Sequence, residues 1–152
     1  MRWVVDDVLE SGLGVAACDV LTDKGTLDAV GLRKDGAAAR ARYRAAVHRL
    51  LAPGGLLVVT SCNCTLGELV GEFCSPQERD TWSKEPCSKG CAGLCVTQDC
   101  RREGLGGAEA GTSPAGVQWE YVDHVRTYPV FRFGGVEGTR VCTVAFRQRK
   151  AE

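Results

Sequence analysis

The sequence lacks a net charge and a long apolar run. Its 152 residues carry 19 basic and 19 acidic side chains, so the formal net charge is zero. Without a net charge, no field of the whole protein draws the chain onto nucleic acid or an anionic membrane, and we expect neither as a partner. No apolar run approaches the roughly 20 residues that span a bilayer, and the first residues are not a basic segment followed by an apolar one. We therefore expect a soluble intracellular protein.

Large aliphatic side chains are scarce in residues 74–117. This stretch is rich in glycine and cysteine, and its large aliphatics are only Leu94, Val96, Leu105 and Val117. Such a segment cannot bury enough apolar surface to offset an ordering cost of roughly 1–2 kcal/mol per residue. We expect a disordered, dispensable insertion that divides one domain into residues 1–73 and residues 118–152.

The nine cysteines are unevenly distributed. Four of them lie in or beside strand-like runs, where a reduced thiol behaves as a small buried hydrophobe: Cys18, Cys62, Cys64 and Cys142. The other five lie within residues 74–117, and four of these follow the spacing C-x₃-C-x₃-C-x₄-C from Cys87 to Cys100. Four thiolates can bind zinc, but the spacing lacks the C-x₂-C pairs typical of zinc sites. We assign no metal site, and a zinc-binding interaction module remains the alternative function.

Short apolar runs alternate with helical patterns, which predicts an α/β fold. We expect strands at residues 3–5, 18–22 and 56–60, a helical turn at 26–32, and helices at 37–51 and 65–73. Residues 119–125 and 139–146 predict an antiparallel hairpin. The run at 56–60 is continuously apolar, which predicts helices on both faces of the sheet. We expect the arginines of the helix at 37–51 to face water.

Two acids follow predicted strands. Asp7 comes after Trp3-Val4-Val5, and Asp23 ends the run that starts at Cys18. Ligands of open α/β sheets bind at the carboxyl ends of strands, where an acid can accept hydrogen bonds from a ribose or an amine. Two plainer interpretations stay open: Asp7 as a solvated loop acid, and Asp23 as a cap of the following turn.

Three blocks of sequence carry a resemblance to a known family. Residues 23–29 read DKGTLDA, residues 60–73 read TSCNCTLGELVGEF, and residues 131–135 read FRFGG. Together they resemble the class I S-adenosylmethionine-dependent methyltransferases. The most specific similarity is to the eukaryotic lysine methyltransferases of the methyltransferase-like 10 type, which modify translation elongation factor 1-alpha.

The resemblance implies a fold, a reaction and a set of site residues. The fold would be the C-terminal part of a Rossmann-like class I methyltransferase sheet, mostly parallel, with an antiparallel final hairpin. The reaction would be methyl transfer from S-adenosyl-L-methionine to a lysine of elongation factor 1-alpha, in the cytoplasm and also the nucleus. The implied site residues are Asp23 as catalytic, Asp7, Val8 and Asp23 as cofactor-binding, and Thr26 and Asn63 as substrate-binding.

The sequence departs from this family in two places. Ahead of residues 3–5 it has neither the Gly-rich loop nor the second-strand acid with which the family holds the cofactor. Residues 74–117 also separate two segments that the family joins with only a few residues. We therefore expect a fragment or splice variant that does not itself transfer methyl groups.

Overall fold

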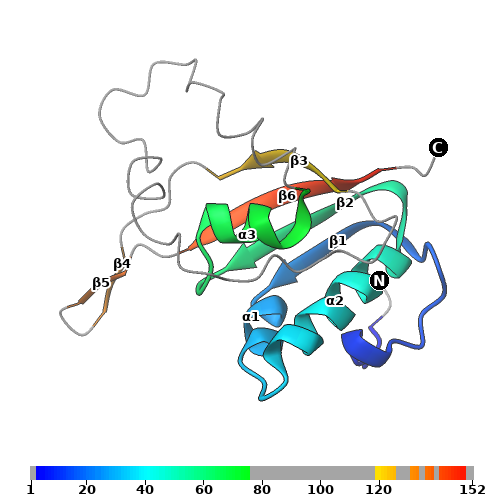
Figure 1. The fold of residues 1–152 in the computed structure, drawn as a ribbon, viewed down its shortest axis with the longest axis horizontal. Helices are drawn as coiled ribbons and strands as arrows, with labels where there is room; N and C mark the ends of the chain where they lie inside the picture. The colour runs from blue at the N-terminus through cyan, green and yellow to red at the C-terminus, as the bar shows by residue number, and fades with distance from the viewer. Residues whose placement is uncertain (1–2, 76–118, 126–130, 134–135, 139–140, 150–152) are drawn as a thin grey trace.

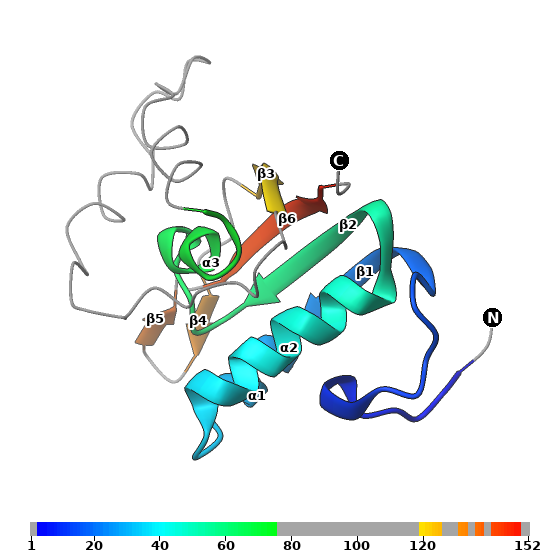
Figure 2. The same cartoon turned by 45° about the vertical axis from the view of Figure 1, so that its right-hand side comes forward.

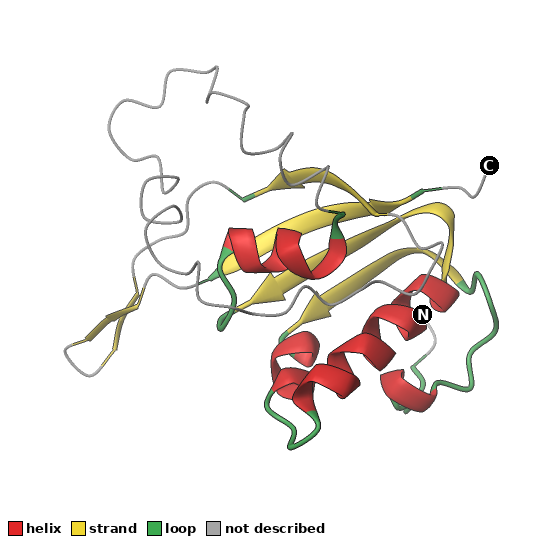
Figure 3. Cartoon of the chain, viewed as in Figure 1, coloured by secondary structure: helices red, strands yellow, loops and turns green. Residues whose placement is uncertain are grey.

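The computed structural model describes residues 3–75, 119–125, 131–133, 136–138 and 141–149. Figure 1 shows the described elements, and Figure 3 distinguishes the helices from the strands. The first part comprises the 3-10 turn η1 (Val8–Glu10), β1 (Cys18–Lys24), α1 (Thr26–Gly31), α2 (Gly36–Leu50), β2 (Leu51–Ser61) and α3 (Leu66–Phe73). The second part comprises β3 (Trp119–His124), β4 (Phe131–Phe133), β5 (Val136–Gly138) and β6 (Cys142–Gln148).

The main sheet has the strand order β1-β2-β6-β3, and β4 pairs with β5 in a separate ribbon. β1 and β2 run parallel, whereas β2–β6 and β3–β6 are antiparallel pairs. The predictions of an α/β fold and of an antiparallel pair near the C-terminus are confirmed. The prediction of a mostly parallel sheet is wrong for the described strands. Strand β6 lies between β2 and β3 and runs antiparallel to both. Only the β1–β2 pairing is therefore parallel, and the sheet is mixed.

The buried core lies on one face of this sheet. Leu57 and Val59 of β2 are fully buried, whereas the intervening Leu56 and Val58 are partly exposed. Figures 1 and 2 show α2 and α3 together over the same face. Among the described helices, none matches the predicted cover on the other face of residues 56–60. Burial alternates along this run, but the sequence does not show the alternation because the run is continuously apolar. Which residues are buried depends on which face of the sheet the helices occupy. The core residues that these two helices contribute include Tyr43, Val47, Leu69 and Phe73.

Helix α2 occupies residues 36–50, close to the predicted 37–51, but one of its arginines contradicts the expectation. Arg44 is only 5% exposed. It forms an ion pair with Glu72 of α3, so the two helices are joined by a buried charge pair. The prediction that the arginines of this helix face water is wrong for Arg44, because its partner is 28 residues away and leaves no local signal.

Residues 3–5 do not form the predicted strand. The structure assigns no regular secondary structure there, and Trp3 and Val5 are 86% and 104% exposed. A strand needs a neighbour to pair its backbone groups. Within the described residues the sheet begins at β1, so these three residues have no strand beside them.

Strand β2 begins five residues earlier than the predicted residues 56–60, directly after α2. Pro53 and Gly54 lie inside it, and Gly54 has a φ of 87°, which an L-residue with a side chain rarely adopts. Along β1, the register moves from Cys18↔Leu51 to Val20↔Leu56. The proline and glycines therefore form a bulge opposite the start of β1, and the regular ladder starts at Leu56.

The predicted insertion lies outside the described residues, except for its first two. Cys74 is buried, at 4% exposed, and belongs to the core. Among described residues, no group of three potential metal ligands occurs, and no helix has the length and hydropathy needed to cross a membrane. The four cysteines of the zinc alternative lie outside the described part: Cys87, Cys91, Cys95 and Cys100.

Candidate functional site

The carboxyl ends of β1 and β2 meet at one edge of the sheet. The two strands are parallel and in register up to Lys24↔Thr60. The chain leaving β1 is tied to the end of β2, because the Gly25 amide donates to the Thr60 carbonyl at 3.0 Å. The first two sequence blocks, DKGTLDA and TSCNCT, therefore lie side by side at the edge where α/β sheets bind ligands.

Asp23 is buried at this edge and has a complete set of hydrogen bonds. It is 4% exposed. One carboxylate oxygen accepts from the Thr26 amide at 2.7 Å, and the other accepts from the Leu27 amide at 2.9 Å and the Tyr43 hydroxyl at 2.5 Å. Two of these donors belong to the first turn of α1, whose amides have no partner within the helix.

The geometry of Asp23 favours the capping interpretation over direct contact with a ligand. Burial and the neighbouring Asp23 carboxylate both raise the pKa of Tyr43 far above its ordinary value. The phenol therefore stays protonated and donates to Asp23. With three donors held in this way, Asp23 positions α1 and α2 relative to the end of β1.

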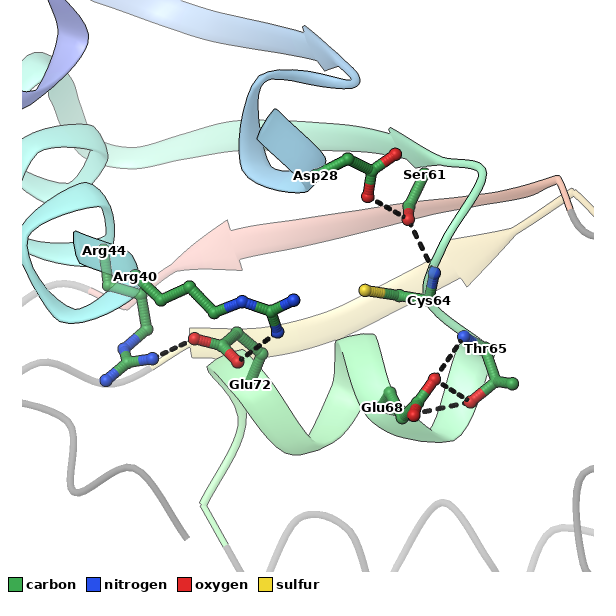
Figure 4. Close-up of polar contacts among 8 residues, drawn as sticks. All are labelled: Asp28, Arg40, Arg44, Ser61, Cys64, Thr65, Glu68 and Glu72. Atoms are coloured by element: carbon green, nitrogen blue, oxygen red, sulfur yellow. Dashed lines mark hydrogen bonds and ion pairs between the residues drawn. The ribbon is translucent and has the colours of Figure 1, made fainter. Parts of the chain in front are cut away.

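A second buried acid at the same edge was missed by sequence reasoning. Asp28 of α1 is 8% exposed, and its two oxygens accept from the Ser61 hydroxyl at 2.5 Å and the Cys62 amide at 2.9 Å. Ser61 in turn accepts from the amides of Asn63 and Cys64. Figure 4 shows Asp28 and Ser61 facing each other, with Cys64 beyond. The one available signal was an acid between Leu27 and Val30, inside the apolar stripe of a short helix.

The chain beyond Ser61 is anchored again at the start of α3. The helix predicted at residues 65–73 begins with a capping box of Thr65 and Glu68, in which each side chain bonds the other residue's backbone amide. At the other end of α3, Glu72 pairs with Arg44 and, at 3.4 Å, with Arg40 of α2 (Figure 4). The loop after β2 is therefore held by α1 on one side and by α3 on the other, and the ion pairs of Glu72 join α3 to α2.

Thr26 and Asn63, the predicted substrate-binding residues, are both exposed. Thr26 begins α1, directly after β1, and Asn63 lies in the loop directly after β2. The structure thus places both at the carboxyl edge, and their role in binding substrate stays a prediction. A hydroxyl and an amide at this edge can donate or accept hydrogen bonds without bringing a charge.

Asp7 and Val8, the predicted cofactor-binding pair, lie elsewhere. Asp7 is exposed and caps η1 by accepting from the Leu9 amide at 2.9 Å. Figures 1 and 2 show η1 beside the C-terminal half of α2, away from the carboxyl ends of β1 and β2. Arg49 of α2 secures this segment by donating to the Ser11 and Leu13 carbonyls. The structure therefore does not bring Asp7 and Val8 together with Asp23.

The described residues do not by themselves fit S-adenosylmethionine. A hollow of about 460 Å³ does occur, but it lies between η1 and α2, lined by residues that include Leu9, Arg42 and Ala46. At the carboxyl edge, the oxygens of both buried acids, Asp23 and Asp28, accept hydrogen bonds from the protein itself. The acidic groups that could bind a ribose are thus either occupied or distant from this edge.

Comparisons with known proteins agree with the resemblance carried by the sequence blocks. The chain is 29% identical over 132 residues to the protein-lysine N-methyltransferase EFM4 of Saccharomyces cerevisiae, a match that covers 84% of this chain and 39% of that protein. It is 37% identical over 74 residues to human EEF1A lysine methyltransferase 2, covering 48% of this chain and 31% of the human protein. No protein-family model matches the chain.

A third relative, the protein-lysine N-methyltransferase efm4 of Schizosaccharomyces pombe, is 40% identical over 58 residues, which cover 36% of this chain and 24% of the yeast protein. The chain thus spans well under half the length of each of these relatives. All three are named as protein-lysine methyltransferases. We conclude that the chain resembles, over part of their length, the lysine methyltransferases of the EFM4 and EEF1A lysine methyltransferase 2 type.

Proposed function

We propose that this chain forms part of an S-adenosylmethionine-dependent protein-lysine N-methyltransferase that acts on the elongation factor EEF1A. The observation that carries the proposal is the meeting of the DKGTLDA and TSCNCT blocks at one edge of the sheet, with Asp28 of the first bonded to Ser61 and Cys62 of the second. The names of the matched relatives supply the substrate and the reaction class.

Within this proposal, the exposed groups at the edge face the substrate lysine. Methyl transfer needs a neutral amine held in line with the methyl group, and it needs little covalent help from the protein. The Thr26 hydroxyl and the Asn63 amide can orient such an amine. Asp23 is a positioning residue, since its oxygens hold the start of α1, and therefore Thr26, in place.

We further propose that the chain alone does not transfer methyl groups. Asp7 and Val8 are remote from Asp23, and the carboxylates at the edge are occupied by internal donors. The remaining length of the relatives, well over half of each, would supply the rest of the cofactor site. The cytoplasmic and nuclear location stays a prediction.

The test is a chimera with the human relative. The 74 matched residues of human EEF1A lysine methyltransferase 2 are replaced by the matching residues of this chain. The chimera is incubated with S-adenosylmethionine and recombinant EEF1A, and lysine methylation is measured by mass spectrometry. We expect the chimera to methylate EEF1A, and we expect no methylation from the chain alone.

Two variants of the chimera are the controls. Asp23→Ala should lower methylation strongly, whereas Lys34→Ala, an exposed change in the turn before α2, should leave it unchanged. A chimera that folds, as judged by its thermal transition, yet leaves EEF1A unmodified would contradict the proposed function. Binding of S-adenosylmethionine to the chain alone with micromolar affinity, measured by calorimetry, would contradict its inactivity.

A further inference from the structure

We propose that Asp28 is a positioning residue which, through Ser61, fixes the loop after β2 so that Cys62 and Asn63 form one wall of the substrate site. The inference rests on the proposed function for the identity of the substrate. We call the bonds of Asp28 and Ser61 to each other and to the amides of residues 62–64 the clamp. The clamp itself rests on contacts within this chain. Sequence reasoning assigned no role to Asp28 or Ser61, although both lie in the blocks that carry the resemblance.

The Ser61 hydroxyl is saturated by this clamp. Ser61 is 0% exposed and donates its one O–H to Asp28. Its oxygen also accepts two amides, from Asn63 at 3.1 Å and Cys64 at 2.8 Å. A serine hydroxyl has one donor and two acceptor lone pairs, so nothing remains for a substrate. The group serves to shape the loop.

Four consecutive amides of the loop are bonded to side chains. The Cys62 amide donates to Asp28, and the amides of Asn63 and Cys64 donate to Ser61. The Thr65 amide donates to Glu68 at 2.7 Å. Because the amides of Cys62, Asn63 and Cys64 are bonded to the buried Asp28 and Ser61, the loop leaves the side chains of Cys62 and Asn63 exposed.

A buried carboxylate is a costly way to support a loop, and this cost points to a need for one exact shape. Burying an ionised acid is unfavourable unless hydrogen bonds compensate it. An apolar side chain in place of Asp28 would pack in the same place, but it would leave the backbone conformations of the three residues 62–64 unspecified. Fully satisfied polar networks stabilise a single arrangement, which is what an orienting group such as Asn63 requires.

The first experiment measures loop opening in the full chain by thiol alkylation. Cys64 is 8% exposed, and burial raises the pKa of its thiol, so it reacts only when the loop opens. Cys62 is exposed and should react in every variant. Cys74, 4% exposed at the far end of α3, reports global unfolding. Iodoacetamide labelling under native conditions, read by peptide mass spectrometry, distinguishes the three thiols.

We expect Asp28→Ala and Ser61→Ala each to raise the labelling rate of Cys64 at least tenfold while Cys74 stays protected. Asp35→Ala is the matched control, because it removes an exposed aspartate that pairs with Arg33 and Arg42 and not with the loop or the clamp. If Cys64 stays as protected in Asp28→Ala as in the native chain, the clamp is overturned. If Cys74 also becomes reactive in Asp28→Ala, the variant Asp28→Asn is used instead. That side chain keeps the shape and one acceptor oxygen, so the labelling rate of Cys64 should rise by an intermediate factor.

The second experiment measures kinetics in the active chimera. Asp28→Ala should lower kcat for EEF1A methylation at least tenfold, with the loss persisting at saturating EEF1A, because the amine is bound but poorly oriented. Asp35→Ala should keep kcat within about twofold. The double variant Asp28→Ala/Ser61→Ala should lose less than the two single variants summed, because both single variants remove the Asp28–Ser61 bond.

The two experiments separate the clamp from the function. A tenfold loss of kcat in Asp35→Ala as well would overturn the positioning role, because general destabilisation would then explain the result. An inactive native chimera would overturn the proposed function and with it the substrate wall. Protection of Cys64 by Asp28 in the full chain would still establish the clamp.

Discussion

Asp7 and Asp23 stand in similar sequences and have opposite environments. Each follows a short apolar run with β-branched residues, and each predicts an acid at the end of a strand. Asp7 is exposed and caps a single 3-10 turn through one amide. Asp23 is buried with three donors at the edge of a four-stranded sheet. The difference shows that an acid after an apolar run acquires its role from the strand beside it.

The comparison extends to the segments that carry these acids. Residues 3–15 expose several large apolar side chains and are held by the hydrogen bonds of Arg49 and by the packing of Val8 and Leu9 against the core. Residues 23–73 bury most of theirs, with Leu32 the exception, and are joined by the contacts of Asp23, Asp28 and Glu72. If this contrast is correct, substitutions in the second segment should cost far more stability than equivalent substitutions in the first.

The largest expected effect is that of Asp23→Ala. It leaves two amides of α1 and the buried Tyr43 hydroxyl without their acceptor. Hydrogen bonds to charged groups contribute about 1.5–3 kcal/mol each, so the loss of three should lower the free energy of unfolding by about 5 kcal/mol. Asp7→Ala should lower it by less than about 1 kcal/mol. Urea unfolding followed by circular dichroism measures both, and equal losses would break the comparison.

Glu72→Ala should have the next largest effect. It leaves the buried Arg44 guanidinium without its acidic partner, and breaking one side of a buried pair costs about 3 kcal/mol. The control is Asp35→Ala, which breaks the exposed pairs with Arg33 and Arg42 and should cost less than about 1 kcal/mol. The same unfolding measurement applies. A small loss for Glu72→Ala would mean that α2 and α3 are held by apolar contacts alone.

Substitutions of the exposed apolar residues should be nearly neutral. Trp3→Ser and Val5→Ser remove side chains that are 86% and 104% exposed. We expect each to change the free energy of unfolding by less than about 0.5 kcal/mol. Val59→Ser, at a fully buried position of β2, is the contrast and should destabilise strongly. A large loss for Trp3→Ser would show that residues 3–5 bury their side chains in solution.

The smallest effect is a pH dependence from His48. Burial lowers its pKa below the ordinary value of 6.5, and its ring lies edge-on to Trp119 at 6.2 Å. Because the unfolded chain then binds the proton more tightly, stability is full above pH 6.5 and falls as the pH drops through the folded pKa. His48→Gln should reduce the change in the thermal unfolding midpoint between pH 7.5 and pH 5. An unchanged slope in this variant would assign the pH dependence to other groups.

Sequence reasoning succeeded where the determinants are local. The helix predicted at residues 65–73 begins with a capping box of Thr65 and Glu68 that spans four residues, and the helix predicted at residues 37–51 ends just before Pro53, so both depend on residues that are adjacent in the chain. The place of Asn63 near a strand end also followed from its position after the apolar run at 56–60. In each case, the energy that decides the outcome comes from neighbours within one or two turns.

Tertiary structure alone decided the rest, because the partners are far apart in sequence. Asp28 meets Ser61 across 33 residues, and Glu72 meets Arg44 across 28. Which face of β2 is buried depends on where α2 and α3 lie, and whether an acid caps, binds or stays in water depends on the strand next to it. The sequence by itself determined the helices, the strand-forming runs and the residues at their ends. Contacts of high sequence separation, which carry no local pattern, decided which of those residues form the buried edge of the sheet.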